Sequence, residues 1–151
     1  AGMSFVAACD YRVAALSAKF KQAYTSVGLS GDGAWMLLVP MLIGYARAME
    51  MVFFDPLIDA EKALAWGLVN RIVEDDKLME SSMAVADQLA SGATKAYGLA
   101  KNNLNHAMMG ILATQLQFEA EGMIKSSMAT KDYLEGIKAF LERRKPEFIG
   151  R

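Results

Sequence analysis

The chain has 151 residues, of which 54% are hydrophobic and 22% charged, a composition that is typical of a globular chain with a core and excludes disorder. Its length fits one domain or a piece of a larger one. The net charge is −1 and the isoelectric point is near 5.9, so there is no basic field to hold nucleic acid or an anionic membrane. We therefore expect no nucleic-acid partner and no membrane partner.

The chain contains one cysteine, Cys9, and one histidine, His106. A single cysteine permits no internal disulfide, and one histidine beside it gives too few ligands for zinc. Catalytic triads built on Ser-His-Asp or Cys-His are poorly supported for the same reason. We expect no metal site and no metal or redox cofactor, and we interpret His106 as structural or solvated.

The longest apolar run, residues 34–43, is interrupted by Pro40. It falls well short of the roughly 20 residues that a membrane-spanning helix needs. The sequence therefore predicts a soluble protein, which we place in the cytoplasm.

The first half of the chain alternates short helical and extended patterns. The pattern predicts a short buried helix over residues 2–9, strands over residues 10–14 and 18–21, and helices from the turn at Asp32 to about Ile43 and over residues 45–53, separated by Gly44. Asp55-Pro56 marks a turn. Asp59 is a good N-cap for a helix over residues 60–66 that Gly67 would end, and a brief strand over residues 68–73 follows.

After about residue 75 the pattern becomes almost wholly helical. Apolar residues share one face of a first helix at intervals of four, three and four: Met79, Met83, Ala86 and Ala90. Three further helices are predicted over residues 94–109, 111–127 and 130–144, and one face of the last carries Tyr133, Ile137, Phe140 and Arg144. The eleven methionines fit adaptable packing or an oligomer seam better than a cofactor site.

A glycine-rich turn, residues 27–35, places Asp32 just ahead of an apolar helix. The glycines allow backbone conformations closed to other residues, and Asp before a helix is most often an N-cap. A sharper interpretation is general-base chemistry, because apolar and aromatic neighbours would leave the carboxylate poorly hydrated. These neighbours are Tyr24, Val27, Leu29, Trp35 and Met36.

The two predicted strands cannot form a stable sheet by themselves, since isolated strand pairs are marginal in water. The helical half would then have nothing adequate to pack on. We therefore expect an N-terminal part, carrying most of the sheet, to precede Ala1.

Four segments together resemble the C-terminal part of the enoyl-CoA hydratase/isomerase (crotonase) superfamily, in order and in spacing. They are residues 1–12, 18–33, 60–70 and 135–146. The resemblance implies an α/β fold, a spiral of ββα units over residues 1–89 followed by a helical trimerisation region over residues 90–151. It also implies an acyl-CoA substrate, with coenzyme A as part of that substrate, and assembly as a homotrimer or a dimer of trimers. The preceding half would hold most of the CoA-binding groove.

The family stabilises an enolate in an oxyanion hole made of two backbone N–H groups, and the second of these maps onto Ala1. A helix N-terminus suits that role because its N–H groups are free and its dipole favours negative charge. The two glutamates that hydratases use map onto Ser4 and Tyr24, neither of which can do a carboxylate's work. Asp32 maps onto the catalytic carboxylate of the superfamily's isomerases, including the ring-epoxide type of phenylacetate breakdown.

Several residues are candidates for contact with the substrate. Tyr24, Leu29 and Trp35 would line the pocket around Asp32, and the resemblance places Phe140 on the adenine and Arg143 on a phosphate of CoA, often across a subunit boundary. The alternative for Phe140 is a core aromatic, and for Arg143 a solvated cation.

The resemblance favours an isomerase in which Asp32 alone moves a proton from one end of a dienolate to the other, shifting a β,γ double bond to the α,β position. Two alternatives stay open. Asp32 could be a nucleophile, as in the superfamily's hydrolytic dehalogenases, or the chain could be a non-catalytic CoA-binding assembly module in which Asp32 only caps a helix. The acyl group and the metabolic pathway are not encoded in these residues.

Overall fold

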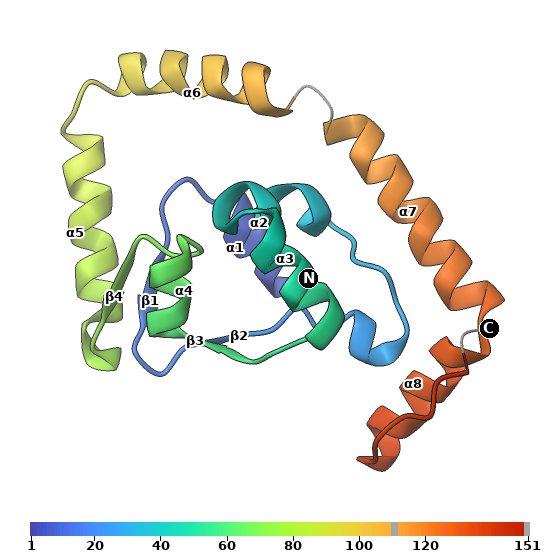
Figure 1. Cartoon of the computed structure of the whole chain (residues 1–151). Helices are drawn as coiled ribbons and strands as arrows, with labels where there is room; N and C mark the ends of the chain where they lie inside the picture. The colour runs from blue at the N-terminus through green and yellow to red at the C-terminus, as the bar shows by residue number, and fades with distance from the viewer. Residues whose placement is uncertain (110–111, 150–151) are drawn as a thin grey trace.

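The computed structural model describes residues 1–109 and 112–149, and Figure 1 shows the course of the chain. The elements are α1 (Gly2–Ala8), β1 (Val13–Ala15), β2 (Lys19–Phe20), η1 (Thr25–Val27), α2 (Trp35–Ile43), α3 (Tyr45–Phe54), β3 (Ile58–Asp59), α4 (Ala60–Trp66), β4 (Arg71–Val73), η2 (Asp75–Lys77), α5 (Leu78–Ala90), α6 (Thr94–Met109), α7 (Leu112–Ala129) and α8 (Lys131–Glu142). The predicted change from a mixed to a helical chain near residue 75 is confirmed. The predicted start of the seventh helix, Ile111, lies outside the described residues.

The strands form two small sheets. β1 pairs with β4 in parallel, with Val13 opposite Arg71, and β2 pairs with β3 in antiparallel fashion, with Phe20 opposite Ile58. Each sheet has two strands, which is too few to enclose a core alone.

The strand predicted over residues 10–14 begins later, at Val13, because Arg12 is hydrogen-bonded to Asn70 and Leu68. The Arg12 N–H donates to Asn70 Oδ1 at 2.9 Å, and its Nε donates to the Leu68 carbonyl at 2.7 Å. The strand predicted over residues 68–73 is likewise shortened to Arg71–Val73. The N–H of Leu68 donates instead to the Ala63 carbonyl at 2.9 Å, so this residue closes the preceding helix.

The short helix α4 has the ends that its sequence predicts. The Asp59 carboxylate accepts the N–H of Lys62 at 2.8 Å, and Gly67 ends the helix in the left-handed conformation at φ +81°. A glycine tolerates this conformation without the cost that a side chain would add.

The core lies between α1, α2, α3 and the two sheets. Its largest fully buried side chains are Trp35, Met51, Ile58, Leu68 and Val39. α1 is only partly covered, because Ser4 and Ala7 are buried while Cys9 at its end is exposed. The buried helix predicted over residues 2–9 is therefore confirmed as a helix but has one buried face.

Helices α5, α6 and α7 follow one another around the outside of this core, and we call them the helical arm (Figure 1). The arm exposes many large apolar side chains: Met79, Met83, Leu89, Tyr97, Leu99, Leu104, Met108, Leu116, Phe118 and Ile124. The face predicted for α5 exists, but Met79 is 70% exposed and Met83 54% exposed. The rest of the described chain does not cover that face.

The last helix, α8, returns to the core and packs on η1. Two glycines let the backbones approach closely: a Cβ on Gly136 would lie 2.6 Å from the carbonyl of Val27, and one on Gly28 would lie 2.9 Å from the carbonyl of Asp132. Gly136 and Ala139 are the buried residues of α8. The face that carries Phe140 is not the packed one, since Phe140 is 70% exposed.

No helix within residues 1–109 and 112–149 combines the length and the apolar character that crossing a bilayer requires.

Candidate functional site

Tyr24 and Asp32 meet on two neighbouring loops between β2 and α2. The Tyr24 hydroxyl donates to Asp32 Oδ1 at 2.6 Å, and only 9% of Tyr24 is exposed. Burial of the phenol, followed by its hydrogen bond to Asp32, raises the pKa of Tyr24, against a smaller opposing effect of a hydrogen bond from Ser4. Tyr24 therefore remains a protonated donor at neutral pH, and Oδ1 of Asp32 is held in place.

Ser4 joins the same cluster from α1. It is 6% exposed, and its hydroxyl donates to the backbone carbonyl of Asp32 at 3.3 Å. Gly33 makes this approach possible, because a Cβ there would lie 3.3 Å from both Cβ and Oγ of Ser4. The three positions that the family resemblance singled out, Ser4, Tyr24 and Asp32, are thus brought together from separate elements.

The prediction that Asp32 caps the following helix is wrong. Helix α2 begins at Trp35, its N-cap is Ala34, and the Asp32 side chain is bonded to Tyr24 instead. Asp32 contributes only its backbone carbonyl, which accepts the N–H of Trp35 at 3.1 Å.

The carboxylate that caps α2 belongs to Glu119 of α7. Its Oε2 accepts the N–H of Ala34 at 2.6 Å, and its Oε1 accepts the N–H of Met36 at 3.2 Å. No local pattern indicates this role, because Glu119 lies in the middle of a helix and Ala34 is 85 residues away. Glu119 was not among the predicted site residues.

The two other predicted pocket residues near Asp32 lie at different depths. Leu29 is half-buried against the core, and its N–H donates to the Tyr24 carbonyl at 3.0 Å. Trp35 is completely buried, so its side chain presents no surface to a ligand in this structure. Trp35 therefore acts as core packing beneath the site, and the predicted contact with substrate is not supported by its position.

Ala1, the predicted oxyanion donor, is the N-cap of α1. Its carbonyl accepts the N–H of Ser4 at 3.0 Å and that of Phe5 at 3.2 Å. Ala1 is exposed, and a Cβ built on Gly2 meets no atom within 4 Å. The first residues of α1 are thus exposed, and Ser4 of the same helix is bonded to the Asp32 carbonyl. The oxyanion role stays a prediction.

Phe140 lies in the last turn of α8, and Arg143 is the C-cap of that helix. Phe140 is 70% exposed, so the alternative that it is a core aromatic is wrong for this chain. Arg143 is exposed and ends α8 in the left-handed conformation at φ +54°. Both side chains are accessible, and their predicted contacts with CoA stay predictions.

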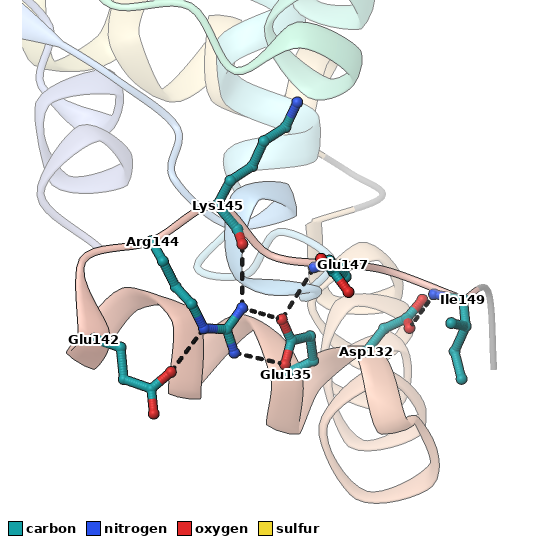
Figure 2. A network of polar contacts seen from close by, with 7 residues as sticks. All are labelled: Asp132, Glu135, Glu142, Arg144, Lys145, Glu147 and Ile149. Atoms are coloured by element: carbon teal, nitrogen blue, oxygen red, sulfur yellow. Dashed lines mark hydrogen bonds and ion pairs between the residues drawn. The ribbon is translucent and has the colours of Figure 1, made fainter.

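The segment after α8 folds back along the helix through a network of polar contacts (Figure 2). Arg144 forms a bidentate pair with Glu135, at 2.6 and 2.9 Å, and donates to Glu142 at 2.7 Å. The N–H of Glu147 donates to Glu135 Oε1 at 3.0 Å, and the N–H of Ile149 donates to Asp132 Oδ1 at 2.8 Å. These bonds hold residues 144–149 against α8.

The cluster around Asp32 is suited to proton transfer. Among the described residues, Oδ2 of Asp32 has no hydrogen-bond partner, whereas Oδ1 is held by Tyr24. A carboxylate with one oxygen fixed and the other open is arranged to accept or return a proton at a defined place. The part of the chain that is described contains no cluster of three or more His, Cys, Asp or Glu residues able to hold a metal ion.

A protein-family model described as enoyl-CoA hydratase/isomerase matches residues 1–151. The chain belongs to this family. It is 36% identical over 153 residues to the 1,2-epoxyphenylacetyl-CoA isomerase of Escherichia coli, a match that covers 100% of this chain and 57% of that protein. It is 32% identical over 146 residues to the short-chain-enoyl-CoA hydratase of Clostridium acetobutylicum, covering 97% of this chain and 56% of that protein.

The fold agrees with the family. The crystal structure of an enoyl-CoA hydratase from Mycobacterium avium subspecies paratuberculosis superposes with a TM-score of 0.92 at 35% identity, over 98% of this chain and 60% of the other. The expected α/β crotonase-like fold is confirmed. This enoyl-CoA hydratase/isomerase family chain spans slightly more than half the length of the relatives that it matches.

Proposed function

We propose that the intact protein is an acyl-CoA isomerase that moves a β,γ double bond to the α,β position, with Asp32 as the single acid-base group. The proposal rests on one observation above all: Asp32 has Oδ1 held by Tyr24 and Oδ2 open, with no second carboxylate at the positions of Ser4 and Tyr24. The acyl-CoA class of substrate is inferred from the relatives, which are named as enzymes acting on CoA thioesters.

In the proposed reaction, Asp32 Oδ2 removes a proton from the α or γ carbon of the acyl group. The electrons move into a dienolate, whose oxygen is stabilised by the backbone N–H of Ala1 and a second donor in the oxyanion hole. Asp32 then returns the proton at the other end of the dienolate. No water is added and no redox or metal cofactor is needed, so one carboxylate suffices.

Tyr24 would hold the base during both transfers, and Ser4 would hold the backbone that carries it. Phe140 and Arg143, which are exposed on α8, would contact the adenine and a phosphate of CoA. The proposal also includes the oxyanion hole, the CoA contacts and assembly as a homotrimer.

Hydration is the second candidate, because one of the similar proteins is named a short-chain-enoyl-CoA hydratase. It requires one residue to activate water and another to protonate the α carbon. Ser4 and Tyr24 are poor groups for these tasks at neutral pH, which places isomerisation ahead.

Analysis of the reaction products distinguishes isomerisation from hydration. The intact protein is incubated with 3-hexenoyl-CoA and, separately, with crotonyl-CoA, and the products are resolved by chromatography and mass. Isomerisation predicts 2-hexenoyl-CoA of unchanged mass and negligible 3-hydroxybutyryl-CoA. Rapid formation of the hydrated product, with no double-bond shift, would overturn the proposal in favour of hydration.

A further inference from the structure

The loop between Asp32 and α2 has an unusual backbone. Gly33 and Ala34 are both left-handed, with φ +61° and +62°, and Ala34 carries a side chain that disfavours this conformation. Such a conformation persists only where the surroundings hold it, and strained residues of this kind concentrate at functional sites.

Glu119 stabilises this left-handed backbone. Glu119 is 5% exposed, and its carboxylate accepts the N–H of Ala34 at 2.6 Å and of Met36 at 3.2 Å. Gln115, one turn earlier on α7, donates to Glu119 Oε1 at 3.2 Å and orients the group. A buried carboxylate at a helix N-terminus is also favoured by the helix dipole.

We propose that Glu119 is a positioning residue: by capping α2 from another helix, it leaves the carboxylate of Asp32 free to meet Tyr24 and the substrate. This inference rests on the proposed acid-base role of Asp32. It explains why an aspartate two residues before the N-cap, a residue type that commonly caps helices, does not do so here.

The carboxylates of Asp32 and Glu119 compete for the free N–H groups at the start of α2. The N–H groups of the first turn have no partners within the helix and need acceptors, most of all where they are buried. If Glu119 no longer accepts from Ala34 and Met36, Asp32 is the carboxylate next to them in the chain. Its side chain would then turn from Tyr24 to the helix.

The first test compares Glu119→Gln with Glu121→Gln in the intact protein. A glutamine offers one acceptor oxygen, and its NH₂ group cannot accept the second N–H. Glu121 is a matched control: it is on α7, exposed, and accepts from Gln117 at 3.3 Å, as Glu119 does from Gln115. We expect Glu119→Gln to lower kcat by about 10- to 100-fold with KM within about twofold, and Glu121→Gln to leave both unchanged.

A second readout does not depend on activity. The protein is labelled with ¹³Cζ-tyrosine, the Tyr24 signal is assigned with Tyr24→Phe, and its pKa is measured in each variant. Because the hydrogen bond to Asp32 helps to raise the pKa of Tyr24, departure of Asp32 should move this pKa back towards its ordinary value in Glu119→Gln only. An unchanged Tyr24 pKa in Glu119→Gln, with unchanged kcat, would overturn the inference. So would an equal change in Glu121→Gln.

A third measurement uses variants that keep Glu119, in case Glu119→Gln does not fold. The amide protons of Ala34 and Met36 should stay protected from hydrogen exchange in Asp32→Ala, because Glu119 still accepts from both of them. Loss of this protection in Asp32→Ala would assign the cap to Asp32 and overturn the inference. If Asp32→Asn kept full isomerase activity, the proposed function would fail, while the protection of the two amides would still decide whether Glu119 is the cap.

Discussion

The two oxygens of Asp32 have different environments, and this difference carries the functional argument at the scale of single residues. Oδ1 receives the Tyr24 hydroxyl at 2.6 Å, while Oδ2 has no partner among the described residues. A hydrogen bond to a charged group typically contributes about 1.5–3 kcal/mol, enough to keep a side chain in one orientation. Tyr24 therefore defines where Oδ2 points.

Tyr24→Phe removes this donor and keeps the ring. We expect kcat to fall about tenfold or more, because the base is no longer held, with a smaller change in KM. Steady-state kinetics on an enoyl-CoA substrate measures both. Tyr45→Phe is the control, since Tyr45 is 74% exposed on α3 and should behave as the wild type. An unchanged kcat in Tyr24→Phe would show that Asp32 does not need this support.

The sequence pointed to Asp32 and its neighbours Ser4 and Tyr24 but not to the residue that caps α2. The glycine-rich turn marked the loop, and the resemblance marked Ser4, Tyr24 and Asp32 as one site. The cap was assigned wrongly, because the residue that satisfies the helix end, Glu119, is 85 residues from Ala34. Local preference favours a nearby aspartate, and only the tertiary fold brings the competing carboxylate into place.

At the scale of elements, the site depends on how α8 meets η1. Gly136 approaches Val27 so closely that a Cβ would lie 2.6 Å from the carbonyl carbon and oxygen. The 3₁₀ turn η1 directly follows Tyr24, so this contact supports the loop that carries the phenol.

Gly136→Ala should therefore destabilise the protein even though alanine is the better helix former. We expect the free energy of unfolding to fall by about 1–3 kcal/mol, the usual cost of overpacking, measured by urea denaturation. Gly98→Ala is the matched control within α6, where a Cβ meets no atom within 4 Å. There the same change should stabilise by about 0.5–1 kcal/mol. Equal effects of the two substitutions would contradict the packing of α8 on η1.

The segment after α8 should detach in acid. The Arg144 guanidinium, together with the Glu147 N–H, lowers the pKa of Glu135 from 4.5 to about 2. A lowered pKa in the folded state means that the carboxylate stabilises this arrangement above pH 4.5 and that its contribution is lost as the pH falls towards 2. The protection factor of the Glu147 amide, which corrects the observed exchange rate for the slower intrinsic exchange in acid, should fall over that range.

Glu135→Gln tests the assignment, because it should expose the same amide to exchange already at neutral pH. Glu142→Gln, which removes a single partner of Arg144, should have the smaller effect. Slow exchange of the Glu147 amide in Glu135→Gln would exclude Glu135 as the anchor of this segment.

Element boundaries were predictable where the chain itself marks them. Gly44 separates α2 from α3, and Asp59 and Gly67 bound α4, because caps and glycines act through their immediate neighbours. The strands were less predictable, since Arg12 and Leu68 bond to distant partners that shorten β1 and β4. The two-residue strand β3 has no pattern of its own and exists only by pairing with β2.

At the scale of the whole molecule, the helical arm and α8 support the site, and the arm exposes apolar surface. α7 reaches the start of α2 through Glu119, and α8 reaches η1 through Gly136. The outer residues of the arm remain uncovered; Leu99 is 67% exposed and Phe118 is 68% exposed. A run of large apolar side chains of this kind is typical of a surface that another chain covers, which supports the proposed trimer.

Leu99→Asp should weaken that assembly. We expect dissociation of the intact protein at concentrations about 10- to 100-fold higher than for the wild type, since a buried leucine contributes about 1.5–3 kcal/mol. Sedimentation velocity over a concentration series measures this. Asn102→Asp adds the same charge on exposed α6 without removing apolar surface and should assemble normally. Unaltered assembly of Leu99→Asp would place Leu99 outside the interface.

The most direct test of the central claim is the turnover of a β,γ-enoyl-CoA by Asp32→Asn in the intact protein, compared with Glu121→Gln. Asparagine keeps the size of the side chain and its hydrogen bond from Tyr24 but cannot accept the substrate proton. General acid-base groups contribute typically about 10²- to 10⁴-fold, so we predict a loss of kcat in this range with a folded protein that still binds acyl-CoA. A kcat within a few-fold of the wild type would show that Asp32 is not the base and would contradict the account.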